Sequence, residues 1–254
     1  MINLHPKTSN MECSATMLPL GESAVLVEFG GGIHPDTHRK VKAFTKYLDC
    51  HCLPGMIEYV SAFSSVTVFY DSLMVKQLHQ DHVELRKEPS YRIISVILQK
   101  IVAELRTGEG QESRIVEIPV CYGGELGPDL VYVAEYNKLT VDEVIDIHSM
   151  GDYLVYMVGF APGFPYLGGM SEKISTPRRQ SPRMTISAGS VGIAGMQTGV
   201  YPIPTPGGWQ LIGRTPLALF RPNENPPSLL QAGDRIRFYP ISQQEYEEYK
   251  REPI

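Results

Sequence analysis

The sequence has 254 residues, of which 43% are hydrophobic, and its formal net charge is −5. A chain of this size and composition buries one large core or two modest ones, which excludes a disordered or collagen-like protein and favours two domains. The acidic net charge gives no long-range attraction to nucleic acid or to an anionic membrane, so neither partner is expected.

Targeting and metal-binding patterns are not expected either. Residues 1–17 lack the unbroken apolar core of a signal peptide, and no later stretch approaches the roughly 18 apolar residues of a membrane helix, which predicts a cytoplasmic protein. The cysteines, Cys13, Cys50, Cys52 and Cys121, have no C-x-x-C spacing, so no metal site is predicted.

Short strands and helices alternate up to residue 120. Apolar patterns predict strands at 24–29, 56–63, 65–70 and 114–120, and helices at 36–49, 73–86 and 91–106, the last two forming one helical stretch with an interruption. The resulting β-α-β-β-α-β order is that of a ferredoxin-like α+β domain, which we assign to residues 18–113. The polar segment 107–113 then connects it to a second domain.

The pattern changes after residue 115. Pro128 and Asp129 open a short helix, and Thr140 to Glu143 has the spacing of a capping box at the start of another. Short strands between Gly and Pro turns follow, ending with a strand at 235–239 and a solvated helix at 243–252. This spacing predicts a mainly-β barrel or sandwich at residues 114–242.

Residues 159–216 are rich in glycine, proline and positive charge. They hold eleven of the 23 glycines and eight of the 20 prolines, and their net charge is 5 − 1 = +4, while the rest of the chain sums to 18 − 27 = −9. Glycine lets the backbone approach a ligand closely, and arginine binds carboxylate or phosphate through paired hydrogen bonds. The segment therefore predicts a site for a small anion.

Three arginines of this segment lie within TPRRQSPR, residues 176–183. Solvated surface charge is their usual role, but no acidic residue neighbours Arg178, Arg179 or Arg183 in the sequence to form a local salt bridge. We therefore expect these three, with Arg214 of PTPGGWQLIGRTP, to bind substrate or another anion.

Residues 187–202, SAGSVGIAGMQTGVYP, place Ser190 between Gly189 and Gly192. Ala188 stands where the G-x-S-x-G nucleophile elbow needs glycine, and no strand-to-helix turn follows, so Ser190 is not predicted to be a nucleophile. We expect Ser190, Gln197 and the amide groups of Gly189 and Gly192 to donate hydrogen bonds to the anion.

Apolar residues near these donors are candidates for the walls of a pocket. They come from GFAPGFPYLGG, residues 159–169, and from two later positions: Phe160, Pro162, Phe164, Tyr166, Tyr201 and Trp209. Alternatively, the loop is a rigid turn whose aromatic side chains pack inward, and Trp209 anchors the core. We predict that the 159–169 loop, the 187–202 stretch and the PGGW loop converge on one concave face.

His148 is the one histidine near these motifs, at the end of the capped helix. It is either a hydrogen-bonded helix-end residue or a candidate general acid or base, which leaves the catalytic residues unknown. The sequence has neither a Gly-Lys dipeptide nor a G-x-G-x-x-G fingerprint, so ATP would be bound unconventionally or by a partner.

Taken together, the motifs of the second half closely resemble one family. IPVCYGGELGPDL (118–130), GFAPGFPYLGG, PRRQSPR, AGSVGIAGMQTGVYP and PGGWQLIGRTPLALF resemble the family of the 5-oxoprolinase B subunit, also called KipI. This family is related to the first subunit of allophanate hydrolase and to part of the carboxyltransferase region of urea carboxylase. The resemblance covers nearly all of residues 115–239, whereas the segments before Leu18 and at 73–88 depart from it.

The resemblance implies an N-terminal α/β domain and a C-terminal cyclophilin-like β-barrel. It implies a hydrolase component that acts with the A and C subunits of 5-oxoprolinase, the latter as its direct partner, to open 5-oxo-L-proline to L-glutamate using ATP and Mg²⁺. Two other functions stay open: inhibition of a sporulation sensor histidine kinase, and acyl or carboxyl transfer in urea metabolism. The active site can lie within this chain or across a subunit junction.

Overall fold

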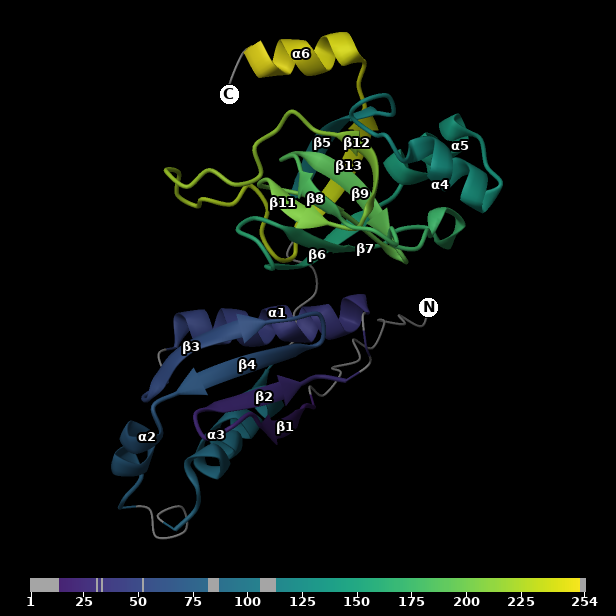
Figure 1. Ribbon diagram of the computed structural model, residues 1–254. Helices are drawn as coiled ribbons and strands as arrows, with labels where there is room; N and C mark the ends of the chain where they lie inside the picture. Colours follow the sequence, from purple (N-terminus) through teal and green to yellow (C-terminus); the bar gives the residue numbers. More distant parts are fainter. Residues whose placement is uncertain are drawn as a thin grey trace, which may run out of the picture. The chain divides into compact units, whose positions relative to one another are not determined.

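The computed structural model describes residues 14–30, 32, 34–51, 53–81, 87–105 and 113–251. The chain divides into two compact units, residues 1–111 and 112–254, which we call the first and second units (Figure 1). Among the described residues, no helix combines the length and the apolar character needed to cross a membrane.

The first unit is a four-stranded antiparallel sheet with the strand order β1-β2-β4-β3. Its strands are β1 Thr16–Pro19, β2 Ala24–Glu28, β3 Met56–Ser61 and β4 Ser65–Tyr70, and its helices are α1 Pro35–Cys50, α2 Ser72–Leu78 and α3 Ser90–Glu104. Side chains alternate along β4, so that Val66, Val68 and Tyr70 share one core with Phe44 of α1 and Leu98 of α3.

Two predictions for this unit are wrong. Residues 114–120 do not complete its sheet, because they belong to β5, Ile115–Tyr122, which pairs within the second unit. The edge beside β2 is taken by β1, whose largely exposed residues lack a strand pattern. The helix predicted at 73–86 ends at Leu78, and residues 82–86 lie outside the described residues. The ferredoxin-like description stays a prediction.

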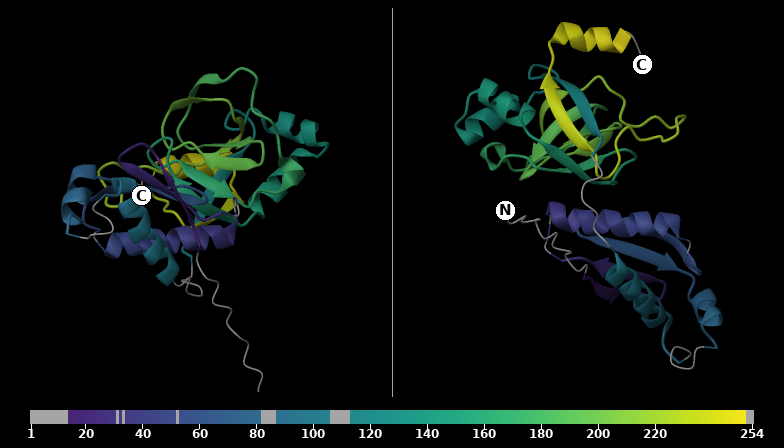
Figure 2. Two further views of the ribbon diagram at one scale, coloured as in Figure 1. Left: turned by 90° about the horizontal axis from the view of Figure 1, so that it is seen from below. Right: turned by 180° about the vertical axis from the view of Figure 1, so that it is seen from behind.

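In the second unit, seven strands form one sheet in the order β10-β9-β12-β5-β13-β6-β7. Strand β10 also contacts β7, so this sheet nearly closes into a barrel (Figure 2). The further bounds are β6 Tyr153–Val158, β7 Pro165–Gly168, β9 Ser190–Ala194, β10 Gln197–Val200, β12 Gln210–Arg214 and β13 Arg235–Pro240, with β8 Arg183–Ile186 paired separately to β11 Thr205–Gly207. The predicted barrel is confirmed in this form, and its cyclophilin-like description stays a prediction.

Two helices pack beside the barrel, α4 Leu130–Asn137 against β12 and α5 Val141–Ser149 against β13 (Figure 1). Helix α5 begins with the predicted capping box, in which the Glu143 amide donates to the Thr140 hydroxyl and the Glu143 carboxylate accepts from the Thr140 amide. The remaining helices are the short η1 Glu172–Ile174 and the C-terminal α6 Gln243–Arg251. Val155, Ile193 and Phe238 help to fill the barrel interior, so a ligand site is expected at its loops.

Candidate functional site

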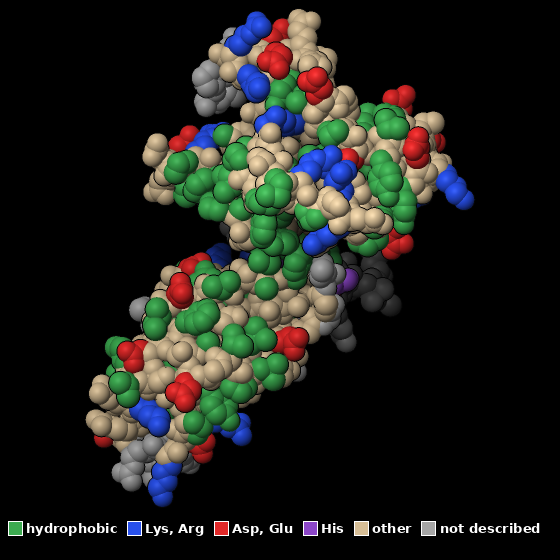
Figure 3. All heavy atoms as spheres, viewed as in Figure 1, with side chains coloured by type: hydrophobic (Ala, Val, Ile, Leu, Met, Phe, Trp, Pro, Cys, Tyr) green, Lys and Arg blue, Asp and Glu red, His purple; other side chains and the backbone are tan. Residues whose placement is uncertain are grey.

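A pocket of about 200 Å³ lies where three parts of the second unit meet. Its lining residues come from the loop between β5 and α4, from β8 and the turn after it, and from β9 and β12: Glu125, Leu126, Pro128, Arg183, Thr185, Ile186, Ser187, Ser190, Leu211 and Arg214. On the face of the second unit seen in Figure 3, Lys and Arg side chains gather next to hydrophobic ones.

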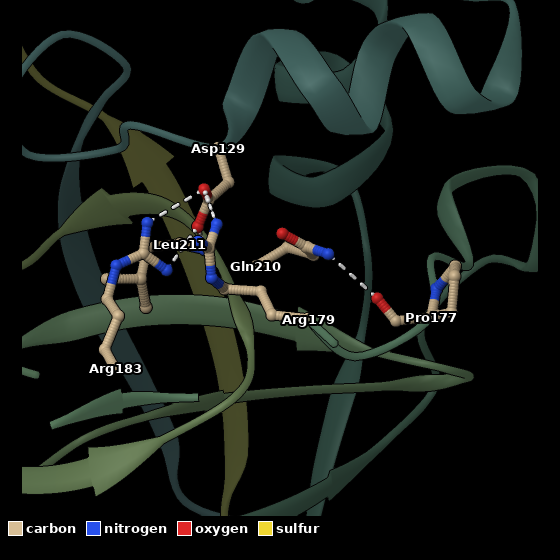
Figure 4. Close-up of polar contacts among 6 residues, drawn as sticks. All are labelled: Asp129, Pro177, Arg179, Arg183, Gln210 and Leu211. Atoms are coloured by element: carbon tan, nitrogen blue, oxygen red, sulfur yellow. Dashed lines mark hydrogen bonds and ion pairs between the residues drawn. The ribbon is translucent and has the colours of Figure 1, made fainter. Parts of the chain in front are cut away.

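Asp129, at the end of the β5–α4 loop, binds two arginines (Figure 4). Its Oδ1 accepts hydrogen bonds from Nη1 of Arg179 (3.0 Å) and Nη2 of Arg183 (2.9 Å). Its Oδ2 accepts from Nη1 of Arg183 (2.8 Å) and from the amide of Leu211 (2.7 Å). The Asp129 side chain is 7% exposed and that of Arg183 is 24% exposed, so the carboxylate is the buried partner and Arg183 reaches into the pocket wall.

Backbone hydrogen bonds fix the β5–α4 loop on β12. The Gly123 amide donates to the Ile212 carbonyl (3.0 Å), and the Asp129 amide donates to the Leu211 carbonyl (2.9 Å). Gly127 lies so close that a Cβ atom would be 2.1 Å from the Ile212 carbonyl oxygen. Only glycine lets this loop reach the strand, which explains the residue type within the GGELGPD sequence.

The arginine segment is held on the same side of the barrel. The Arg179 amide donates to the Gly208 carbonyl (2.7 Å), and Nε2 of Gln210 donates to the Pro177 carbonyl (3.0 Å) (Figure 4). Gln210 is buried within a strand, and no motif in the sequence indicated its role. These bonds place Arg183 at the start of β8 beside the pocket.

Arg214 enters the pocket from β12. Its Nε donates to the Ala188 carbonyl (2.8 Å), which joins it to the turn before β9. Gly189 in this turn has a φ of 81°, and a Cβ atom there would lie 2.3 Å from the Thr215 carbonyl oxygen. Among the residues that the structure describes, no carboxylate lies within ion-pair distance of Arg214.

The pocket combines positive charge, hydroxyl groups and apolar surface. Arg183 and Arg214 provide the cations, Thr185, Ser187 and Ser190 the hydroxyl groups, and Leu126, Ile186 and Leu211 the apolar surface. One carboxylate, that of Glu125, also lines it. Asp129 offsets only part of the charge, because Arg179, Arg183 and Asp129 together carry +1. A small organic acid with an apolar body matches these groups.

The structure brings together only some of the predicted anion-binding residues. Arg183, Arg214 and Ser190 line one pocket, whereas Arg178 is exposed and Gln197 lies on β10, both away from the lining residues. The expectation that no acid neighbours the arginines is wrong, because Asp129 precedes Arg179 by 50 positions and Arg183 by 54. The sequence predicts Asp129 only as a helix start, yet its carboxylate caps no helix amide.

The predicted roles of two glycine amides are also corrected. The Gly189 amide donates to the Tyr201 carbonyl (2.7 Å) and is therefore not available to an anion. Gly192 is buried in the middle of β9, which pairs with β10 on one side and β12 on the other. Both glycines serve close backbone packing instead.

The predicted aromatic walls form a small core instead. Phe164, Tyr201 and Trp209 are buried and cluster with Ile186 and Leu211, with the Phe164 and Trp209 rings in edge contact at 5.8 Å. Phe160 is 70% exposed, Pro162 is exposed and Tyr166 is half-buried. None of the six described candidates lines the pocket. Because Ile186 and Leu211 belong to both, this core supports the apolar side of the pocket.

His148 is buried between α5 and the barrel. Its Nδ1 lies 2.8 Å from the Tyr122 hydroxyl and its Nε2 lies 2.9 Å from the Thr198 hydroxyl. Burial lowers the pKa of His148 to about 3, which keeps the ring neutral. Of its two predicted roles, this geometry matches the hydrogen-bonded structural one, because a buried ring with both nitrogens bonded cannot reach a substrate.

Comparisons with known proteins agree with the resemblance. Residues 15–230 match the family described as carboxyltransferase domain, subdomain C and D. The chain is 53% identical over 233 residues to the 5-oxoprolinase B subunit of Bacillus subtilis (strain 168), which covers 92% of this chain and 95% of that protein. It is 41% identical to the 5-oxoprolinase B subunit of Haemophilus influenzae, covering 87% of this chain and 96% of that one.

These matches define first a class, the proteins with carboxyltransferase subdomains C and D. Within this class, the chain belongs to the family of the 5-oxoprolinase B subunit, as the motifs predicted.

Solved structures are similar over most of the chain. The TTHA0988 crystal structure has a TM-score of 0.70 at 32% identity and covers 86% of this chain, which spans only 40% of that one. The conserved uncharacterized protein PH0987 from Pyrococcus horikoshii has a TM-score of 0.52 at 43% identity, covering 91% of this chain and 100% of that one. The Kluyveromyces lactis urea carboxylase shares the fold, with a TM-score of 0.70 at 19% identity over 98% of this chain and 24% of that one.

Proposed function

We propose that this chain is the B subunit of an ATP-dependent 5-oxoprolinase, which hydrolyses 5-oxo-L-proline to L-glutamate. The observation that carries the proposal is the 53% identity to the Bacillus subtilis protein over nearly the whole length of both chains. The urea amidolyase relatives favour a role in urea metabolism less, because their identity is 26% and the match covers 14% of the larger protein. Inhibition of a sensor histidine kinase stays a prediction that no contact of the pocket favours.

The pocket would bind the substrate through its carboxylate. 5-Oxo-L-proline has one carboxylate on a small ring, and the pocket offers two guanidinium groups on an apolar base formed by Leu126, Ile186 and Leu211. Arg183 and Arg214 enter from different strands, so they can hold the carboxylate from two sides. Glu125 lines the same pocket and is placed to accept the lactam N–H.

The reaction needs help at the lactam carbonyl, because an amide is a poor electrophile. ATP supplies this help by activating the carbonyl oxygen through phosphorylation. The pocket of about 200 Å³ suits a small acid and is below the roughly 300 Å³ at which sites for larger ligands begin, so its residues do not fit ATP with Mg²⁺. In this proposal, nucleotide binding belongs to another subunit or to the junction with it, while this chain binds and orients the substrate.

The partners in this proposal are the A and C subunits of 5-oxoprolinase, with the second of these in direct contact. The relatives are themselves named as one lettered component of an enzyme, which supports a multi-subunit assembly. We expect the active site to be completed across a subunit junction, because the described pocket has binding groups but no accessible histidine to transfer protons.

Reconstitution tests the proposal. The chain is co-purified with the A and C subunits, and glutamate release from 5-oxo-L-proline is measured with and without ATP. We expect turnover by the full complex only, and none by this chain alone or by the other two subunits without it. Robust turnover by the isolated chain, or full activity of the complex without it, would refute the assignment.

A further inference from the structure

Asp129 lies at the one point where the β5–α4 loop, the arginine segment and β12 are joined by hydrogen bonds. We propose that Asp129 is a positioning residue that holds the guanidinium group of Arg183 in the pocket wall, so that the remaining N–H groups of Arg183 face a bound carboxylate. This inference rests on the proposed function of the pocket, but it concerns a residue outside the pocket lining.

The geometry favours orientation over simple charge pairing. Both Nη atoms of Arg183 bond to the two carboxylate oxygens, at 2.8 and 2.9 Å, which fixes the plane of the guanidinium group. The carboxylate is itself fixed by the Leu211 amide at 2.7 Å, on a strand of the barrel. An arginine side chain otherwise has many rotamers, and their loss on binding would weaken affinity.

Arg179 completes the arrangement from the other side. Its Nη1 shares Oδ1 of Asp129 with Arg183, and its own amide is bonded to Gly208. It lies outside the pocket lining, so its charge balances the shared carboxylate while its side chain helps to keep Asp129 in place. The three residues form a unit in which only Arg183 meets the ligand.

Charge and geometry predict opposite results for Asp129→Asn. The substitution removes a negative charge beside the pocket, so attraction alone would make an anion bind more tightly. The amide of asparagine would instead point donors at an arginine and release the guanidinium group of Arg183. Positioning therefore predicts weaker binding, by about ten- to a hundredfold, the range seen when a partner that orients a ligand-binding side chain is removed.

The second unit offers a matched control in Asp234. It is also buried and accepts Nε (3.1 Å) and Nη2 (2.5 Å) of Arg114 together with the Gln231 amide (2.8 Å). Its neighbour Arg235 pairs with Ile115, where β5 begins, whereas the loop to Asp129 leaves the other end of β5. Asp234→Asn should lower stability in a similar way and leave anion binding unchanged.

The experiment is isothermal titration of 5-oxo-L-proline, and separately of inorganic phosphate, into the folded full chain of wild type, D129N and D234N. We expect weaker binding of 5-oxo-L-proline by D129N alone. Equal or tighter binding by D129N overturns the inference, and so does an equal loss in D234N. If D129N does not fold, D129E, which keeps the charge but shifts the carboxylate, takes its place with weaker binding expected.

The outcomes for Asp129 and for the proposed function are distinct. A wild-type chain that binds neither probe refutes the pocket, and with it the role of Asp129. Tight binding that is unaffected in D129N refutes only the positioning role. In the reconstituted complex, D129N should raise KM for 5-oxo-L-proline more than it lowers kcat, whereas a merely destabilised protein would lose active enzyme and keep KM.

Discussion

The Tyr122 hydroxyl of β5 lies 2.8 Å from Nδ1 of His148, at the end of α5. Thr198 of β10 contacts the other ring nitrogen at 2.9 Å, and the Tyr153 hydroxyl donates to the His148 carbonyl at 2.7 Å. A neutral imidazole thus connects a helix to three strands of the barrel, and this makes the second unit sensitive to acid.

Stability should therefore fall with pH through His148. Its folded-state pKa of about 3 is below the ordinary histidine pKa of 6.5, so the unfolded state takes up the proton first and stability is lost as pH falls below 6.5. Between about pH 7 and about pH 5, we expect this group to account for a loss of about 2 kcal/mol. Denaturant unfolding at both pH values should show a smaller loss for His148→Gln, and an identical loss would contradict the assignment.

Gly127→Ala should disturb the β5–α4 loop. A Cβ atom would meet the Ile212 carbonyl oxygen at 2.1 Å, so we expect a loss of more than about 2 kcal/mol in the free energy of unfolding, together with weaker binding of 5-oxo-L-proline. Gly124→Ala is the control in the same loop. Its φ is 54° but a Cβ atom meets nothing within 4 Å, so only the left-handed backbone conformation costs about 1 kcal/mol. Equal losses in chemical denaturation would show that the close contact is not important.

Arg183→Ala and Arg178→Ala should differ in stability. The first leaves the buried Asp129 carboxylate with only Arg179 and the Leu211 amide, which should cost about 1 to 3 kcal/mol. The second removes an exposed side chain and should stay within about 0.5 kcal/mol. Chemical denaturation of both variants measures this difference, and similar values would mean that the ion pair adds little to folding.

Arg214 should act on substrate affinity. Arg214→Gln removes the charge and the Nε donor to Ala188, so KM for 5-oxo-L-proline in the reconstituted complex should rise by at least about tenfold. Arg214→Lys keeps the charge and should recover only part of this loss, because lysine cannot form two parallel hydrogen bonds. Arg178→Gln is the control and should change KM less than about twofold. An unchanged KM in Arg214→Gln would place the carboxylate elsewhere.

Local patterns in the sequence determined the features that depend on near neighbours in the chain. Thr140 and Glu143 are three positions apart, so their spacing predicts the capping box. Gly and Pro turns between short strands likewise predict a barrel. The motifs also indicated Arg183, Arg214 and Ser190 as parts of one site, and the family to which the chain belongs.

Only the tertiary structure decided which of these residues meet. Asp129 pairs with Arg183 across 54 positions, and no local pattern indicates a contact between such distant segments. Burial was equally hidden, because the residue types of Phe164, Tyr201 and Trp209 suit both a pocket wall and a core, and only strand pairing decides which face a side chain takes. Strand β1 likewise occupies its edge through hydrogen bonds to β2, which depend on the neighbouring strand and not on an apolar pattern of its own.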